Sequence, residues 1–220
     1  EDVLICSTGI IGVELPMALI RLAIPNIQLT VDGGHSLARA ILTTDKHPKE
    51  VAVSVQVNGK AITIGGIIKG SGMIHPNMAT MLAFLTTDAA VEQRFLSESL
   101  NSVSEETFNM ATIDGDTSPN DTVLLFANGA AETPLLKADS PSAPIFQEAL
   151  HEVCSYLTRE MVRDAEGAQK VFSVRVDGAF SHEDARKAAR AVASSTLVKT
   201  AVHGSDPNWG RIVVALGRSG

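Results

Sequence analysis

One stretch of the chain joins a loop of glycines and a proline to an apolar segment, with a threonine at the junction. It runs from Lys69 to Asp88 as KGSGMIHPNMATMLAFLTTD, and Thr80 stands where the loop meets an apolar, strand-like segment. A threonine becomes a competent nucleophile when it is the first residue of a chain, because its own α-amino group then serves as the base. The segment is therefore suited to nucleophilic catalysis once the chain is cut before Thr80.

Other familiar catalytic arrangements do not occur in the sequence. Lys69 precedes Gly70, which is the reverse of the order in a phosphate-binding P-loop, and the nearby glycines do not match the dinucleotide fingerprint. The six histidines include no pair at i, i+4, and only His151 has a cysteine close by, Cys154. The acidic loop 114–121 lacks the trailing glutamate of a calcium loop, so we expect it to bond to itself near the site. We therefore expect no bound metal.

Composition excludes several classes of protein. The net charge is −7 over 220 residues, which argues against nucleic acid as a partner. The two cysteines are too few for a disulfide framework, so we expect reduced thiols and a cytoplasmic location. No apolar run approaches the length that spans a bilayer, and no signal peptide is evident. The chain opens at Glu1 and ends at Gly220 without a clear stop, which is typical of a piece of a longer protein.

Strand and helix patterns alternate along the chain, so the fold class we predict is α/β with helices covering sheets. Asn58-Gly59 between two alternating segments is a strong hairpin signal. Asp88, Ser181 with Asp184, and Asp206 are expected helix caps. We expect strands over 3–6, 51–57, 61–64, 80–85, 123–126, 171–176 and 197–202. We expect helices over 16–23, 33–43, 146–161 (ended by Gly167) and 181–193, one after Asp88, and one from Pro207.

Eight segments together resemble the ornithine acetyltransferase family, also called glutamate N-acetyltransferase. They run in family order over essentially the whole chain, as CSTGIIGV from Cys6, AILTTD from Ala40, KGSGMIHP from Lys69, ATMLAF from Ala79, DGDT from Asp114, NDT from Asn120, AEGA from Ala165 and GSDPNWGR from Gly204. The resemblance implies an α/β sandwich of helices packed on two mixed sheets.

The resemblance also implies an activity and a division of the chain. The precursor would cut itself between Ala79 and Thr80, so that 1–79 is the C-terminal part of an α piece and 80–220 the N-terminal and central part of a β piece. Thr80 would then take the acetyl group of N-acetylornithine and pass it to glutamate, with ping-pong kinetics, in arginine biosynthesis. Two copies of each piece would form a heterotetramer. No cofactor is implied, and acetyl-CoA as a second acetyl donor is left open.

Several residues take roles from the family by position. Thr8 and Gly9 would form the oxyanion hole, through a hydroxyl and a backbone N–H. Thr43 and Lys69 match substrate-contacting positions, with the adjacent Thr44 as the alternative to Thr43. Glu166 matches a residue that contacts the substrate amine and handles protons. Without the family context, these residues would be read as an ordinary turn, a solvated lysine and a helix-end glutamate.

Two other functions stay open at the level of sequence. A self-processing amidohydrolase or aminopeptidase would use the same threonine with water as acceptor, and added glutamate separates it from a transferase. An inactive fragment is the second alternative, because the family extends beyond both ends of this chain. Its C-terminal segment carries an Asn and a Ser or Thr that line the substrate pocket, and these positions do not exist here.

Overall fold

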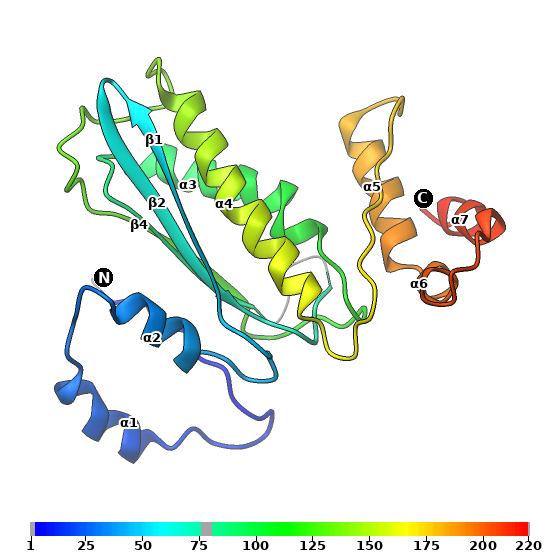
Figure 1. The fold of residues 1–220 in the computed structure, drawn as a ribbon, viewed down its shortest axis with the longest axis horizontal. Helices are drawn as coiled ribbons and strands as arrows, with labels where there is room; N and C mark the ends of the chain where they lie inside the picture. Colours follow the sequence, from blue (N-terminus) through cyan, green and yellow to red (C-terminus); the bar gives the residue numbers. More distant parts are fainter. Residues whose placement is uncertain (1–2, 76–80, 220) are drawn as a thin grey trace.

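A mixed β-sheet organises the described part of the chain. A computed structural model describes residues 3–75 and 81–219. Within them the sheet has the order β1-β2-β3-β4, with β1 (Lys49–Val57), β2 (Lys60–Lys69), β3 (Leu82–Thr87) and β4 (Thr122–Ala127). The pairs β1–β2 and β2–β3 are antiparallel, and β3 runs parallel to β4 (Figure 1). The predicted α/β class is confirmed, and the described residues contain one sheet where the resemblance implied two.

The hairpin between β1 and β2 forms where the sequence predicts it. Val57 pairs with Lys60, which leaves Asn58 and Gly59 as a two-residue loop. Both loop residues have positive φ, 52° and 79°, as a turn that matches the twist of the flanking strands requires. β2 and β3 lie on either side of 76–80, so the two pieces expected from a cut at Ala79 share one sheet.

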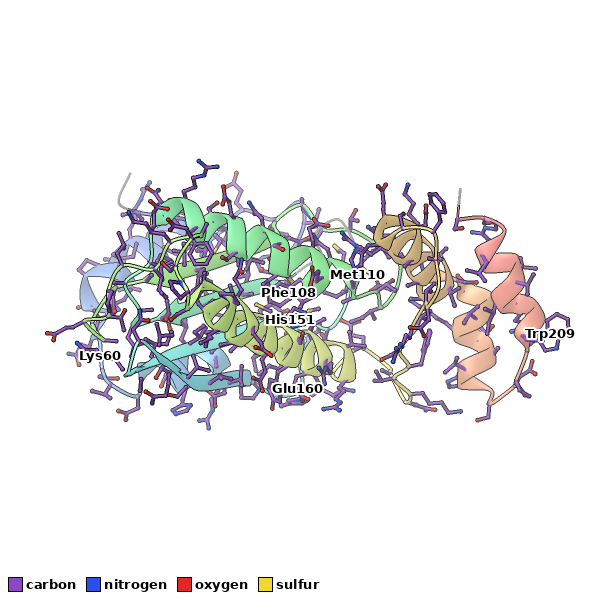
Figure 2. All side chains as sticks on the ribbon, turned by 90° about the horizontal axis from the view of Figure 1, so that it is seen from above. Lys60, Phe108, Met110, His151, Glu160 and Trp209 are labelled. Atoms are coloured by element: carbon purple, nitrogen blue, oxygen red, sulfur yellow. The ribbon has the colours of Figure 1, made fainter. Side chains whose placement is uncertain are left out.

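One helix covers most of one face of the sheet. α4 (Ala143–Arg163) buries the apolar residues spaced by three and four along its length, including Phe146, Leu150, Val153 and Leu157. They pack against Ile62, Ile64, Ile68 and Leu85 of the sheet in the main core. α3 (Gln93–Glu106) lies beside α4, with Phe95 against Phe146, and is followed by the short helix η2 (Phe108–Met110) (Figure 2).

The remaining helices lie around this core. α1 (Met17–Ala23), η1 (Ile24–Asn26) and α2 (Gly33–Ala40) belong to the N-terminal arm, whose apolar side chains are mostly exposed. α5 (His182–Ser194), α6 (Thr196–His203) and α7 (Trp209–Leu216) lie beyond the end of α4 (Figure 1). They pack on a small second core of Val192, Val198 and Ala215. Within the described ranges, no helix is long and apolar enough to cross a membrane.

Three predicted strands are wrong. Residues 197–202 lie in the helix α6, because Ser195 caps its start and the buried Val198 and Ala201 recur at helical spacing. Residues 3–6 and 171–176 have no sheet partner among the described residues. Residues 171–176 do alternate in burial, but a strand also requires a neighbouring strand to pair with its backbone N–H and C=O groups.

Some predicted helix ends also differ. Ser181 caps α5 as predicted, accepting the Asp184 N–H at 3.1 Å. α3 instead begins after Glu92, because the Asp88 carboxylate accepts the Thr63 N–H at 2.7 Å. α7 is capped by Asn208 rather than Asp206. α4 ends at Arg163, so Gly167 does not end it and Glu166 lies in the following loop.

Candidate active site

The expected oxyanion-hole residue Thr8 is held by the loop that precedes β4. The Asn120 side-chain amide donates to Thr8 Oγ1 at 2.9 Å and also to the Ser7 carbonyl. Thr8 is half-buried, while Gly9 is exposed and has the Leu15 side chain beside its Cα. Asn120 thereby orients a hydroxyl that stands 112 positions away in the sequence.

The neighbouring residue, Asp121, holds the chain just after the expected nucleophile. Its Oδ1 accepts the Met81 N–H at 3.0 Å. Its Oδ2 is buried and has no hydrogen-bond partner among the described residues. Burial raises the pKa of Asp121 to about 6, against the opposing effects of the Met81 N–H and the Lys69 charge. Thr80 and Ala79, the predicted cleavage site, lie outside the described residues.

Lys69 ends β2 and is fully buried, so it is not the solvated loop lysine of the alternative interpretation. Burial lowers the pKa of Lys69, while the negative charges of Asp45 and Asp121 oppose this shift. Nearby carboxylates favour the charged form of a buried lysine, so they support the charge of Lys69 inside the fold.

The acidic loop also fixes the glycine-rich loop upstream of the cleavage site. The Asp114 carboxylate accepts the N–H groups of Met73 at 2.6 Å and Ile74 at 3.0 Å, and Asp116 donates its own N–H to it. Asp114 and Asp121 therefore bind the main chain on the two sides of 76–80. The described residues contain no group of three or more His, Cys, Asp or Glu that could hold a metal ion.

The two adjacent threonines of the 43–45 segment have different partners. Thr44 Oγ1 shares a hydrogen bond with Ser71 Oγ at 2.7 Å. Thr43 donates its backbone N–H to Asp45 Oδ2 at 3.2 Å, and its side chain is exposed. The hydroxyl of Thr44 is therefore engaged with the glycine-rich loop, and both threonines are exposed.

Glu166 lies against the glycine-rich loop. Its N–H donates to the Ser71 carbonyl at 2.8 Å. A Cβ built on Gly72 would stand 2.8 Å from Glu166 Oε1, so the absence of a side chain at Gly72 makes room for this carboxylate. Glu166 remains exposed and lines a cavity of about 490 Å³ beside α4, η2 and α5.

The predicted site residues thus fall into two groups joined by the loop 70–75. Thr8 lies beside Asn120. The next residue, Asp121, binds the Met81 N–H, and it is close enough to Lys69 for the lysine charge to act on the pKa of Asp121. Thr44 and Glu166 both lie against the Ser71–Gly72 segment. The 490 Å³ cavity is lined by Glu166 but not by Thr8, Thr43 or Lys69. The described residues therefore do not gather all the predicted residues in one cavity.

Sequence reasoning missed the residues that hold this site together. Asn120 and Asp121 stood in a motif without an assigned role, and only their neighbours in space reveal one. Asp45 and Lys49 pair four positions apart, but outside a helix that spacing does not predict an ion pair. Nothing in the sequence indicates that Asp164 joins them, because it comes from the end of α4.

Comparisons with known proteins identify the family. The model of the ArgJ family matches residues 1–220. Curated relatives named arginine biosynthesis bifunctional protein ArgJ include one from Dehalococcoides mccartyi, 50% identical over all of this chain and 54% of the relative. Another from Symbiobacterium thermophilum is 51% identical over 98% of this chain and 54% of the relative.

A solved structure supports the same conclusion. The crystal structure of arginine biosynthesis bifunctional protein ArgJ from Bacillus halodurans is 44% identical, with a TM-score of 0.61, covering 62% of this chain and 64% of that one. The α/β fold and these matches define the class, and the chain belongs to the ArgJ family, as its resemblance to ornithine acetyltransferases indicated. The chain spans about half the length of the curated relatives it matches.

Proposed function

We propose that this chain is the central part of a glutamate N-acetyltransferase of arginine biosynthesis that activates itself by cleavage between Ala79 and Thr80. The Thr80 hydroxyl attacks the Ala79 carbonyl, and the peptide bond becomes an ester. Water hydrolyses the ester, which frees the Ala79 carboxylate and the Thr80 α-amine. An α-amino group with a pKa near ~8 then serves as a general base at neutral pH.

Acetyl transfer follows by two displacements at the same oxygen. The Thr80 α-amine accepts the proton of the Thr80 hydroxyl, and the hydroxyl oxygen attacks the acetyl carbonyl of N-acetylornithine. The ornithine amine leaves with that proton, and acetyl-Thr80 remains. The amine of glutamate then attacks this ester, giving N-acetylglutamate and restoring the threonine hydroxyl. The Thr8 hydroxyl and Gly9 N–H stabilise the oxyanion in each step, worth roughly 3 kcal/mol per donor.

One observation carries this proposal most directly. Asn120 and Asp121 are adjacent, and the first binds Thr8 while the second binds the Met81 N–H. Consecutive Cα atoms are about 3.8 Å apart, so these two bonds bring the expected oxyanion donor close to the residue that follows Thr80. Family membership of the whole chain supports the same assignment.

The other residues take supporting roles. Lys69 is a buried cation suited to the carboxylate of an amino-acid substrate. Thr43 contacts the substrate, and Glu166 contacts the amine of the substrate. The enzyme requires no cofactor, and acetyl-CoA as a second donor is an open question. We further propose a heterotetramer of α and β pieces, located in the cytoplasm.

Intact mass spectrometry of the full-length protein tests the cleavage. We expect two pieces, one ending at Ala79 and one beginning at Thr80. Thr80→Ala should give a single uncut chain, while the control Thr86→Ala, an exposed threonine on β3, should be cut normally. An uncut wild type would overturn self-activation.

Product analysis then separates the transferase from the hydrolase. With N-acetylornithine and glutamate, the cut protein should form N-acetylglutamate and ornithine in equal amounts. Release of acetate and ornithine at a rate that glutamate does not change would instead identify an amidohydrolase. A cut protein with neither activity would support an inactive family member.

A further inference from the structure

Lys49 is a fully buried lysine whose three donors are all engaged. It begins β1, and its side chain is 0% exposed. Nζ lies 2.6 Å from Asp45 Oδ1, 2.6 Å from Asp164 Oδ2 and 3.2 Å from the His47 carbonyl. Burying a charge costs several kcal/mol unless partners replace the lost water, and here two carboxylates and a carbonyl do so.

The first carboxylate of this network fixes two segments of the candidate site. Asp45 Oδ1 also accepts the Gly70 N–H at 2.7 Å, and its Oδ2 accepts the Thr43 N–H at 3.2 Å. Gly70 directly follows Lys69. Burial favours the neutral acid, but the bonds from Lys49, Gly70 and Thr43 outweigh it and lower the pKa of Asp45. An ionised Asp45 thus holds the backbone of Thr43 and of the chain beside Lys69.

The second carboxylate fixes the approach to Glu166. Asp164 is the C-cap of α4 and is 1% exposed. Its Oδ2 also accepts the Lys46 N–H at 2.9 Å, and His47 Nδ1 lies 3.2 Å from its Oδ1. Two residues later Glu166 donates its N–H to Ser71 and places its carboxylate over Gly72. These contacts therefore fix the position of the end of α4 relative to the glycine-rich loop.

We propose that Lys49 is a positioning residue of the acetyl-transfer site: by pairing with Asp45 and Asp164, it sets the backbone of Thr43, Gly70 and Glu166 relative to one another. Lys49 pairs with Ile68 in the sheet and so lies on the face covered by α4, whereas Lys69 points to the opposite face. Lys49 itself therefore acts through its partners. This inference rests on the proposed function.

Stability alone is a weaker explanation of the network. Buried ion networks contribute little net stability on average when compared with apolar residues of the same size, but they hold their members in one geometry. A network that served only to join β1 to α4 would require one carboxylate. This one uses two, and Asp45 also accepts the N–H groups of Gly70, next to Lys69, and of Thr43, next to Thr44.

The test compares variants of the full-length protein. Lys49→Met keeps the length of the side chain and removes the charge. We expect KM for N-acetylornithine or glutamate to rise at least about tenfold, since displacement of site residues by about 1 Å can cost 100-fold. Self-cleavage should still occur, because Asn120 and Asp121 bind Thr8 and Met81 rather than the carboxylates of this network. Lys49→Arg, which keeps the charge, should restore part of the loss.

A matched control separates positioning from folding. Phe146→Leu alters the same helix at its other end, where Phe146 packs on Phe95 with ring centroids 6.0 Å apart. It should lower the thermal midpoint and leave KM within about twofold of wild type. If Lys49→Met does not fold, Asp164→Asn decides, since it keeps the shape and removes one charge, and a threefold rise in KM is expected.

The outcomes distinguish this proposal from the proposed function. Suppose that the wild type is active and that the Lys49 and Asp164 variants keep KM and kcat within twofold of it. The positioning role of Lys49 is then overturned, and the proposed function stands. The same conclusion follows if Phe146→Leu changes KM as much as Lys49→Met does. A cut wild type that forms no N-acetylglutamate overturns the proposed function and the role of Lys49 with it.

Discussion

Replacing Gly72 by alanine introduces a methyl group where the Glu166 carboxylate now lies. The new Cβ would stand 2.8 Å from Glu166 Oε1 and 2.9 Å from its Cδ. An ordinary contact begins at about 3.4 Å, so the carboxylate must move away by about 0.6 Å or more. The backbone of Gly72 does not require a positive φ, so the contact with Glu166 is the main effect of the substitution.

The expected cost falls on activity rather than on stability. Glu166 is exposed, and an exposed side chain changes its rotamer at a cost of about 1 kcal/mol or less. A displaced group that positions the substrate is far more damaging, since an error of about 1 Å can cost 100-fold in rate. We therefore expect Gly72→Ala to lower kcat/KM by about 10- to 100-fold and to change the free energy of unfolding by less than about 1 kcal/mol.

Gly65 and Gly66, which lie on β2, provide matched controls for Gly72. The nearest atom to a Cβ on Gly65 would be the Val51 carbonyl oxygen at 3.7 Å, so Gly65→Ala should change neither quantity appreciably. A Cβ on Gly66 would stand 2.5 Å from Leu85 and 2.9 Å from Leu157. Gly66→Ala should therefore destabilise the fold by about 1–3 kcal/mol, as overpacked cores do, while the folded fraction keeps its activity.

The assay measures initial rates of N-acetylglutamate formation by the cut, full-length protein over a range of N-acetylornithine concentrations. Denaturant unfolding of the same samples supplies the stability. If Gly72→Ala keeps kcat/KM within threefold of Gly65→Ala, then the position of Glu166 does not matter to the reaction. If Gly66→Ala loses as much activity per folded molecule, the loss at Gly72 is not specific to Glu166.

Three further predictions concern a carboxylate, an amide and a thiol. Burial raises the pKa of Asp121 from 3.8 to about 6, so the folded protein binds the extra proton and loses stability as the pH rises through about 4 to 6. Asp121→Asn should remove that part of the slope in urea unfolding between about pH 4 and about pH 6, and an unchanged slope would contradict the shift. Asn120→Ala removes the bond to Thr8 Oγ1 and should lower kcat about tenfold at constant KM, whereas an unchanged kcat would exclude this role. Burial raises the pKa of Cys154 to about 12, so Ellman's reagent should modify only Cys6 before denaturation, and two fast native thiols would refute this.

Features encoded over a few neighbouring residues were predicted correctly. Asn58-Gly59 forms its hairpin because these two residues tolerate the positive φ of a tight turn. The long helix α4 follows from apolar residues spaced by three and four. Ser181 caps α5 because its hydroxyl reaches the N–H of a residue three positions later.

Features that depend on partners distant in the sequence were not predicted correctly. Residues 197–202 are rich in β-branched residues, yet they form α6 because their buried side pairs with α5 and α7. Asp88 has the chemistry of a helix cap, but the hairpin strand β2 offers it the Thr63 N–H instead. In both cases a neighbour in space outweighed a local preference.

The sequence by itself determined the family, the α/β class, the Asn58-Gly59 turn, the Ser181 cap, and the candidate residues Thr8, Thr43, Lys69, Thr80 and Glu166. Only the tertiary structure decided which other residues hold Thr8, Thr43, Lys69 and Glu166 in place. Asn120 meets Thr8 across 112 positions, and Asp164 meets Lys46 across 118. Burial and hydrogen-bond partners arise when the sheet and α4 bring such segments together, and no spacing along the chain encodes that distance.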